Sequence, residues 1–406
     1  MHKDVVSLCN FPNFVEKKMA KNCYDRYTDI IKVISRIAAI CGANIIHPNF
    51  KIYWLTWIVI IAINAFIACT FYTMYIGLVV DKDWKVILQT LCLMGGAVQG
   101  YSKLLGALYH RSAMVSMNQT LTNIYKDYQK EKEFLKVLSY RIDLTSKILK
   151  LVLCIYLGTL PIIVLYPLIY GLLYGEKLFV MQFLLPGIDP STHIGYMMHN
   201  VVHVFLMCLG GFGNFAGDTY IFVLIIHIPL FKDILKIKFE KLNQMALENP
   251  KKSMRLLKDI VEWHQNYNMF VKQVEQSYYG VIFVQIFTSV MSICCTIFCI
   301  ITHSWPAAFS YLLYSAIFLY VYCGLGHLVE ISNEEVVDVI YGDCLWYELT
   351  IPEQKLVLLM LRKSQRPTTL TIGQVMPLSM STALQLTKAI YSYMMMLLNF
   401  LESDDM

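Results

Sequence analysis

Two histidines inside an apolar stretch form the first arrangement in this sequence that could perform chemistry. His199 and His203 are four residues apart, so on a helix their side chains would share one face. Such a pair can bind zinc when a glutamate follows the first histidine and a third ligand lies nearby. Here Asn200 follows His199, and no third ligand is spaced close by. The pair is interpreted as the polar wall of a pocket or as histidines with structural hydrogen bonds.

Motifs for other chemistry are missing from the sequence. It has no glycine-rich phosphate loop ending in Lys-Ser or Lys-Thr, and no G-x-S-x-G turn for a nucleophile. The net charge of +5 comes from basic loops rather than from a patch that would bind nucleic acid. We therefore expect no enzyme, no metal, no cofactor and no nucleic-acid partner.

An acid and a glycine cluster follow the histidines in the same stretch. Asp218 is a functional candidate because an acid within a membrane is costly and usually has a purpose. At the cytosolic end of a span it would simply be solvated or paired. Gly210, Gly211 and Gly213 weaken a helix, so they could form a hinge, the floor of a ligand cavity or a close helix contact.

The composition indicates which elements must position these side chains. The 406 residues are 57% hydrophobic, 13% aromatic and only 16% charged, and the mean hydropathy is +0.51. A soluble domain usually has about 25% charged residues. We therefore predict an all-α, polytopic membrane protein. Seven stretches approach the roughly 20 apolar residues that a spanning helix needs: 52–80, 86–109, 148–174, 194–230, 278–303, 307–326 and 382–401.

Positive charge orients these seven spans. The segment before the first span, and those between spans two and three, four and five, and six and seven, carry eight, eight, nine and four of the 34 Lys and Arg residues. Because Lys and Arg concentrate on the cytoplasmic side, the N-terminus is predicted in the cytoplasm and the C-terminus outside. This orientation is opposite to that of G-protein-coupled receptors. The 12 cysteines avoid the outer loops and are interpreted as small buried hydrophobes.

The chain is divided by these spans into six parts. In the cytoplasmic parts, apolar residues at helical spacing predict helices that extend the spans, and Asn249-Pro250 is expected to separate two of them. The parts are a cytoplasmic segment (1–51), spans one to four with an outer-loop cap at 175–195 (52–230), a cytoplasmic helical extension (231–277), spans five and six (278–326), cytoplasmic anchor helices (327–381), and a pore-lining helix with a short outer tail (382–406).

The last span carries a polar stripe. Lys388, Ser392, Met396 and Asn399 fall on one face of a helix, with Phe400 beside them. Such a stripe suits a pore wall, and a ring of large apolar side chains suits a gate that closes by dewetting. The alternative is that the stripe faces neighbouring helices.

Several segments carry a family resemblance. The outer loop 183–196 resembles the second outer loop of insect odorant receptors, particularly those of flies and mosquitoes. The last 70 residues or so follow the pattern of the same family through 341–347, 358–367, 370–373, 376–379 and 391–393. The segment from Ser392-Tyr393 to Asn399-Phe400 also resembles the Thr-Tyr…Gln-Phe ending of insect gustatory receptors, which belong to the same superfamily. Ser in place of Thr and Asn in place of Gln favour the odorant branch.

The resemblance implies an odorant-gated, non-selective cation channel of four subunits, in which this odorant-specific chain pairs with a shared co-receptor. It implies a multi-pass protein in the plasma membrane of olfactory sensory neurons. The seventh helix would line the pore, with gating positions at Met396 and Phe400 beside Asn399. The cytoplasmic helices, which carry Trp346, Tyr347, Arg362 and Lys363, would join the subunits.

In the same family, a small volatile ligand binds in the outer half of the helix bundle. A cavity for such a ligand is mostly apolar with a few polar groups. The candidate contacts placed there are Phe71, Thr90, Leu91, Met94, Leu160, Val164, Tyr166, Met197, His199, Asn200, Val204, Met207, Tyr311 and Tyr314. Two alternatives remain open, a homomeric channel of the gustatory type and a transporter. The absence of two matched halves with broken helices is evidence against the transporter.

Overall fold

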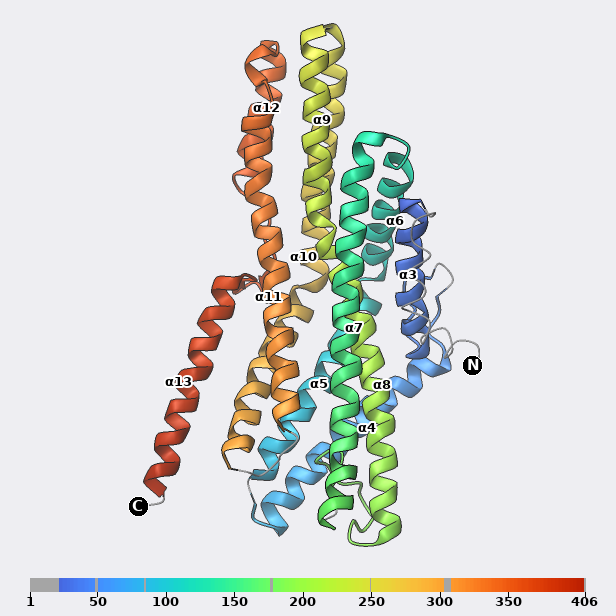
Figure 1. Ribbon diagram of the computed structural model, residues 1–406, viewed down its shortest axis with the longest axis vertical. Helices are drawn as coiled ribbons and strands as arrows, with labels where there is room; N and C mark the ends of the chain where they lie inside the picture. Colours follow the sequence, from blue (N-terminus) through green and yellow to red (C-terminus); the bar gives the residue numbers. More distant parts are fainter. Residues whose placement is uncertain are drawn as a thin grey trace.

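The computed structural model describes residues 22–47, 50–83, 85–175, 178–248, 250–302 and 308–404. These residues form an elongated bundle whose long helices run along one direction (Figure 1). Apart from one short hairpin, every regular element in this described part is helical. The all-α class predicted from the composition is therefore confirmed.

The helices follow the predicted spans closely. The first part of the bundle is made by α3 (Cys23–Ile40), α4 (Trp54–Tyr75), which continues as the π-helical turn η2 (Ile76–Val80), α5 (Lys85–Tyr109), α6 (Arg111–Tyr128), α7 (Lys132–Tyr174) and α8 (His193–Ile226). The second part is made by α9 (Ile228–Glu248), α10 (Pro250–Ile301), α11 (Ala308–Asp338), which continues as the π-helical turn η3 (Val339–Asp343), the 3-10 turn η4 (Trp346–Glu348), α12 (Ile351–Ser364) and α13 (Met380–Asp404).

Several helices are much longer than a membrane is thick. The 52 residues of α10 extend over roughly 78 Å, against about 30 Å for the hydrocarbon core of a bilayer. By length and composition, four described segments could cross a membrane: Trp54–Val80, Lys132–Tyr174, Ser253–Ile301 and Ala308–Asp343. The remaining predicted spans correspond to α5, α8 and α13.

Two helix boundaries show how the local sequence determines where a helix ends. The predicted break at Asn249-Pro250 is confirmed, because α9 ends at Glu248 and α10 begins at Pro250. The predicted end of span four at 230 is wrong. Helix α8 ends at Ile226, because His227 forms a turn in which its ring bonds the Val223 carbonyl at 2.6 Å and the Tyr125 hydroxyl at 3.0 Å. Hydropathy alone could not locate this polar turn within an apolar run.

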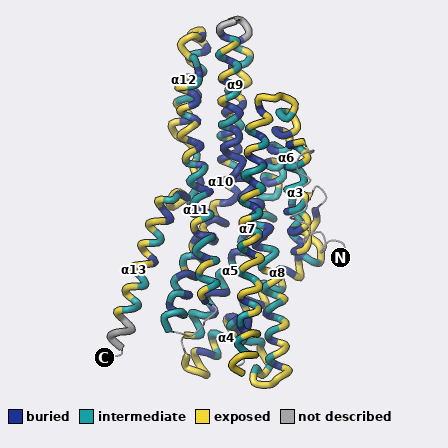
Figure 2. Tube along the Cα trace, in the orientation of Figure 1, coloured by how far each residue is buried: buried dark blue, intermediate teal, exposed yellow. Residues whose placement is uncertain are grey.

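A long run of buried residues occupies the second half of α8 and continues into α9. Phe222, Phe231 and Phe239 are at most 1% exposed there and belong to a single large core cluster. Figure 2 shows buried residues along α9 and α10, whereas α13 is largely exposed or intermediate. The described cysteines are all free thiols, and seven of them are buried as predicted. Cys69 and Cys294 are only partly buried, and Cys154 and Cys208 are exposed, so the prediction of burial is wrong for these two.

A two-stranded hairpin lies between α12 and α13. Strand β1 (Thr371–Ile372) pairs antiparallel with β2 (Met376–Pro377). The hairpin is held on α10 because the Thr371 amide and hydroxyl both donate to the Glu275 carboxylate, the amide at 2.9 Å. From this point α13 leaves the bundle and stands apart from it (Figure 1).

Candidate ligand cavity and its polar network

A cavity of about 230 Å³ lies inside the bundle. Its wall comes from α3 to α8, from α10 and α11, and from the outer loop, so it collects segments that are far apart in the sequence. Most of the wall is apolar, with residues such as Val59, Ile63 and Phe66 of α4 and Leu93 of α5. An apolar cavity of about 150 Å³ is large enough for benzene, so this one can hold a larger organic molecule.

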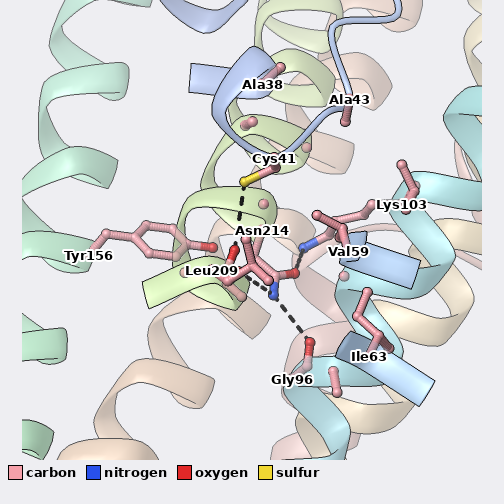
Figure 3. A pocket seen from close by; sticks show the side chains of 18 of the residues that line it. Ala38, Cys41, Ala43, Val59, Ile63, Gly96, Lys103, Tyr156, Leu209 and Asn214 are labelled. Atoms are coloured by element: carbon pink, nitrogen blue, oxygen red, sulfur yellow. Dashed lines mark hydrogen bonds between the residues drawn. The ribbon is translucent and has the colours of Figure 1, made fainter. Parts of the chain in front are cut away.

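The main polar group on the wall is the side chain of Lys103. Its ammonium Nζ lies 3.0 Å from Oδ1 of Asn214 and 2.6 Å from Oδ1 of Asp218. The Asn214 amide in turn donates to the carbonyls of Gly96 and Gly210, each at 3.1 Å. Figure 3 shows the hydrogen bonds that join the Asn214 amide to Lys103 and to the Gly96 carbonyl. Together these bonds connect α5 to α8 at the depth of the cavity.

Asp218 is the centre of this polar network and is fully buried. Besides the Lys103 ammonium, it accepts hydrogen bonds from the Tyr156 hydroxyl at 2.7 Å and from the Tyr322 hydroxyl. The Tyr314 hydroxyl donates to Tyr156 at 3.1 Å. A buried carboxylate is tolerated only when it is paired and hydrogen-bonded. The network satisfies this requirement with donors from α5, α7 and α11.

Small residues make room for the lysine. A Cβ added at Gly217 would lie 2.9 Å from Cδ of Lys103, and one at Gly100 would lie 3.3 Å from the Asn214 amide nitrogen. Gly210 has open space where a Cβ would be, and Gly211 packs against Leu160. Helix α8 continues through the glycines at 210, 211, 213 and 217. Of the roles considered for the glycine cluster, the cavity wall and close helix packing are therefore the ones that the structure contains.

Four of the ligand contacts predicted from the sequence lie on the cavity wall, namely Leu160, Met207, Tyr311 and Tyr314. Leu91, Val164, Tyr166 and Val204 are partly buried against a small apolar cluster around Phe66 and Phe183. Met94 is partly buried. Thr90 is buried, but its hydroxyl donates to the Val86 and Ile87 carbonyls, each at 2.9 Å. Phe71 and Met197 are 55% and 52% exposed, away from the cavity wall.

The histidine pair of α8 binds the outer loop rather than the cavity. His199 accepts a hydrogen bond from the Leu185 amide at 2.9 Å through Nε2, and His203 accepts one from the Met181 amide at 3.4 Å through Nδ1. Asn200 accepts one from the Val180 amide at 3.1 Å. Their polar groups therefore hold the loop backbone. Within the described ranges, no group of three or more His, Cys, Asp or Glu side chains could hold a metal ion.

The predicted pore stripe of α13 lies on the exposed face of the subunit. Lys388, Ser392, Met396 and Asn399 are all exposed, and the Ser392 hydroxyl donates to the Lys388 carbonyl at 3.0 Å within the helix. The opposite face, with Met394, Leu397 and Leu398, is partly buried. The side chain of Phe400 lies outside the described part of the chain.

The predicted anchor residues are also exposed. Trp346 and Tyr347 are 38% and 59% exposed, and Arg362 and Lys363 lie on the exposed side of α12. Leu358 and Leu359 near them are 62% and 60% exposed. This end of the molecule therefore presents apolar and basic side chains together.

The lysine of the network lies on the cavity wall, and it was not predicted as a site residue from the sequence. Asp218 was expected as an acid that could be paired, but Lys103 was not among the candidate residues. The sequence did contain a signal for this ion pair. Lys103 and Asp218 lie inside two different predicted spans, and isolated charges at membrane depth usually pair.

The long apolar helices define a polytopic helical membrane protein, and its bundle contains a mostly apolar cavity. Comparison with known proteins gives the family. The profile described as "7tm Odorant receptor" matches residues 83–391, so the chain belongs to the 7tm odorant receptor family.

Individual relatives agree with this assignment over nearly the whole chain. The chain is 28% identical over 392 residues to the Drosophila melanogaster protein named "Putative odorant receptor 83c", a match that covers 92% of this chain and 97% of the relative. The solved insect olfactory receptor OR5 from Machilis hrabei has the same fold. Its complex with eugenol gives a TM-score of 0.78 at 14% identity, and a second structure of the same receptor gives 0.76 at 16% identity. Each match covers 93% of this chain and 99% of the other.

Proposed function

We propose that this chain is the odorant-binding subunit of a heteromeric, odorant-gated cation channel, opened by a small volatile compound bound in the cavity. The observation that carries the proposal is the mostly apolar cavity of about 230 Å³ with a polar cluster on its wall. This is the chemistry that a small volatile molecule needs, since apolar contact supplies affinity and a few polar groups fix orientation. A protein of the same fold was solved in complex with eugenol, which supports a small organic ligand.

Leu160, Met207, Tyr311 and Tyr314 are the proposed ligand contacts. They come from α7, α8 and α11 and lie on one cavity wall, so a single bound molecule could touch all three helices. The two tyrosine rings stack with centroids 6.1 Å apart. Flat, rigid rings of this kind contact an apolar ligand at low cost in conformational entropy.

The proposed pore is built from α13. Its polar stripe points away from its own subunit, so a conducting path needs further subunits around it. Ser392, Met396, Asn399 and Phe400 are the proposed pore and gate positions. The exposed apolar and basic surface around Trp346, Tyr347, Arg362 and Lys363 is the proposed subunit contact. The proposed partner is a co-receptor subunit in the plasma membrane of olfactory sensory neurons, with the N-terminus in the cytoplasm and the C-terminus outside.

Recording from cells that express this chain with and without an insect odorant co-receptor tests the proposal. Odorant-evoked cation current is expected only when both chains are present. Cells with the co-receptor alone are the control, because they report any response that does not need this chain. A strong current from this chain alone would favour the homomeric gustatory-type channel. A response that requires G proteins and has no current of its own would contradict the channel function altogether.

A further inference from the structure

We infer that Lys103 and Tyr278 form a polar subsite on the cavity wall, and that this subsite selects ligands carrying an oxygen acceptor. This inference rests on the proposed function, because it names the chemical class of the ligand in the same cavity. The expected ligand is an apolar volatile with a carbonyl, ester, ether or hydroxyl oxygen. A pure hydrocarbon of the same shape is the ligand that the subsite disfavours.

Lys103 has one hydrogen-bond donor to spare. An ammonium group carries three N–H donors, and two of them are directed at Asp218 and Asn214. The described residues supply no partner for the third. The lysine side chain is only 4% exposed and lies on the cavity wall. Because an unused donor in an apolar cavity is costly, an acceptor on a bound molecule would gain by meeting it.

Tyr278 provides an independent observation. Its hydroxyl is buried and has no hydrogen-bond partner among the described residues. The residue is 3% exposed and lines the same cavity from α10. Most buried hydroxyl groups in proteins are hydrogen-bonded, so an orphan of this kind needs an explanation. An oxygen of a ligand in the cavity would provide the missing partner.

Three other polar side chains on the wall already have hydrogen-bond partners. Both amide hydrogens of Asn214 are donated to backbone carbonyls. The Tyr156 hydroxyl donates to Asp218 and accepts from Tyr314, and the Tyr220 hydroxyl donates to the Met114 carbonyl at 3.0 Å. The unused capacity is therefore mainly that of a donor. The subsite therefore requires a hydrogen-bond acceptor on the ligand.

Pairs of ligands with equal shape test the subsite in cells that express the chain with its co-receptor. One such pair is nonan-2-one and 2-methylnon-1-ene, in which a methylene group replaces the carbonyl oxygen. A panel of these pairs with different chain lengths and rings is applied, and the half-maximal concentration is measured for each member. The oxygenated member is expected to be at least about tenfold more potent, as a hydrogen bond to a charged donor allows.

The variant Tyr278→Phe is the clean probe, because it removes a hydroxyl that has no partner in the described fold. It is expected to reduce the preference for the oxygenated member by roughly threefold to tenfold. Tyr279→Phe is the matched control, since Tyr279 is the next residue of α10 and is 38% exposed, outside the cavity wall. It should leave the preference intact.

The paired variant Lys103→Met with Asp218→Asn removes both charges together, so that neither is left alone. It should reduce the preference for the oxygenated member to the part that the Tyr278 hydroxyl supplies. Equal potency in the wild-type channel, or an unchanged preference in Tyr278→Phe, would overturn the subsite even if odorant currents are present. The absence of any evoked current in wild type with its co-receptor would instead contradict the proposed function.

Discussion

The polar side chains of the cavity network are buried and bonded to each other, whereas large side chains on one face of helix α13 are exposed. Around the cavity, Lys103 and Asp218 are almost completely buried, and the bonds between them and to Asn214 and Tyr156 join different helices of the same chain. On α13, Tyr391 and Met396 are 58% and 61% exposed, and the helix contacts only part of the bundle, mainly α10 and α11. The cavity network is therefore buried by the single chain itself, whereas α13 has an exposed face that the rest of the chain does not cover.

This difference shows where the chain depends on neighbours. A helix with large exposed apolar residues needs lipid or another protein surface to cover them. The cavity network needs neither, because its charges are paired and its hydroxyl groups mostly bonded. We therefore expect changes in the network to act on the stability of the single chain, and changes on the exposed face of α13 to act on conduction.

The two regions are physically joined through α10 and α11. Tyr278 lies on the cavity wall, and three residues earlier Glu275 of α10 accepts two hydrogen bonds from Thr371 of the hairpin. In α11, Gly326 packs against the backbone just before α13, where an added Cβ would lie 2.0 Å from the Leu378 carbonyl oxygen. A movement of the cavity wall therefore has a short, well-packed route to α13.

The largest expected effect comes from breaking the network at its centre. Asp218→Ala leaves the Lys103 ammonium buried without its carboxylate, which should lower the free energy of unfolding by about 3–5 kcal/mol. Thermal unfolding of the purified protein in detergent measures the change. Adding Lys103→Met should restore most of the loss, because the double variant no longer buries an unpaired charge. If Asp218→Ala is as stable as wild type, the buried network does not stabilise the single chain, and the contrast with α13 fails.

A smaller effect is expected at the junction between the regions. Gly326→Ala places a methyl group against the Leu378 carbonyl oxygen and should lower the free energy of unfolding by about 1–3 kcal/mol, as overpacking does. It should also reduce evoked current per channel at the surface, because the start of α13 must shift. Gly324→Ala is the control, since its nearest neighbour is Met380 Sδ at 4.0 Å. Equal currents from both variants, normalised to surface expression, would argue against this route to α13.

The helices could be predicted well from the sequence, and the network could not. Hydropathy located the long apolar elements, and Asn249-Pro250 marked a boundary, because both signals act locally along the chain. The bond between Lys103 and Asp218 joins residues of different helices, and its geometry depends on the space left by Gly217. The spacing of apolar residues along the sequence does not predict the distance between two side chains on different helices.

The candidate site was predicted only in part for the same reason. Tyr311 and Tyr314 could be placed at the right depth by topology, and they lie on the cavity wall. His199 and Asn200 could be placed on their helix too, but which groups they bind depends on how the outer loop folds back over α8. That loop has no helical period, so nothing in the sequence indicated that its backbone amides would take up these side chains.

The smallest effect on stability, and the sharpest test of the comparison, is expected on α13 itself. Met396→Ala removes an exposed side chain, so the free energy of unfolding should change by no more than about 0.5 kcal/mol. Basal current or relative permeability to Na⁺, K⁺ and Ca²⁺ should nevertheless change, because a pore constriction depends on the size of its side chains. Met394→Ala, on the partly buried face, should instead reduce stability with less effect on permeability. If Met396→Ala changes neither basal current nor selectivity, the exposed stripe faces lipid or another helix, and the uncovered surface of α13 is not the pore.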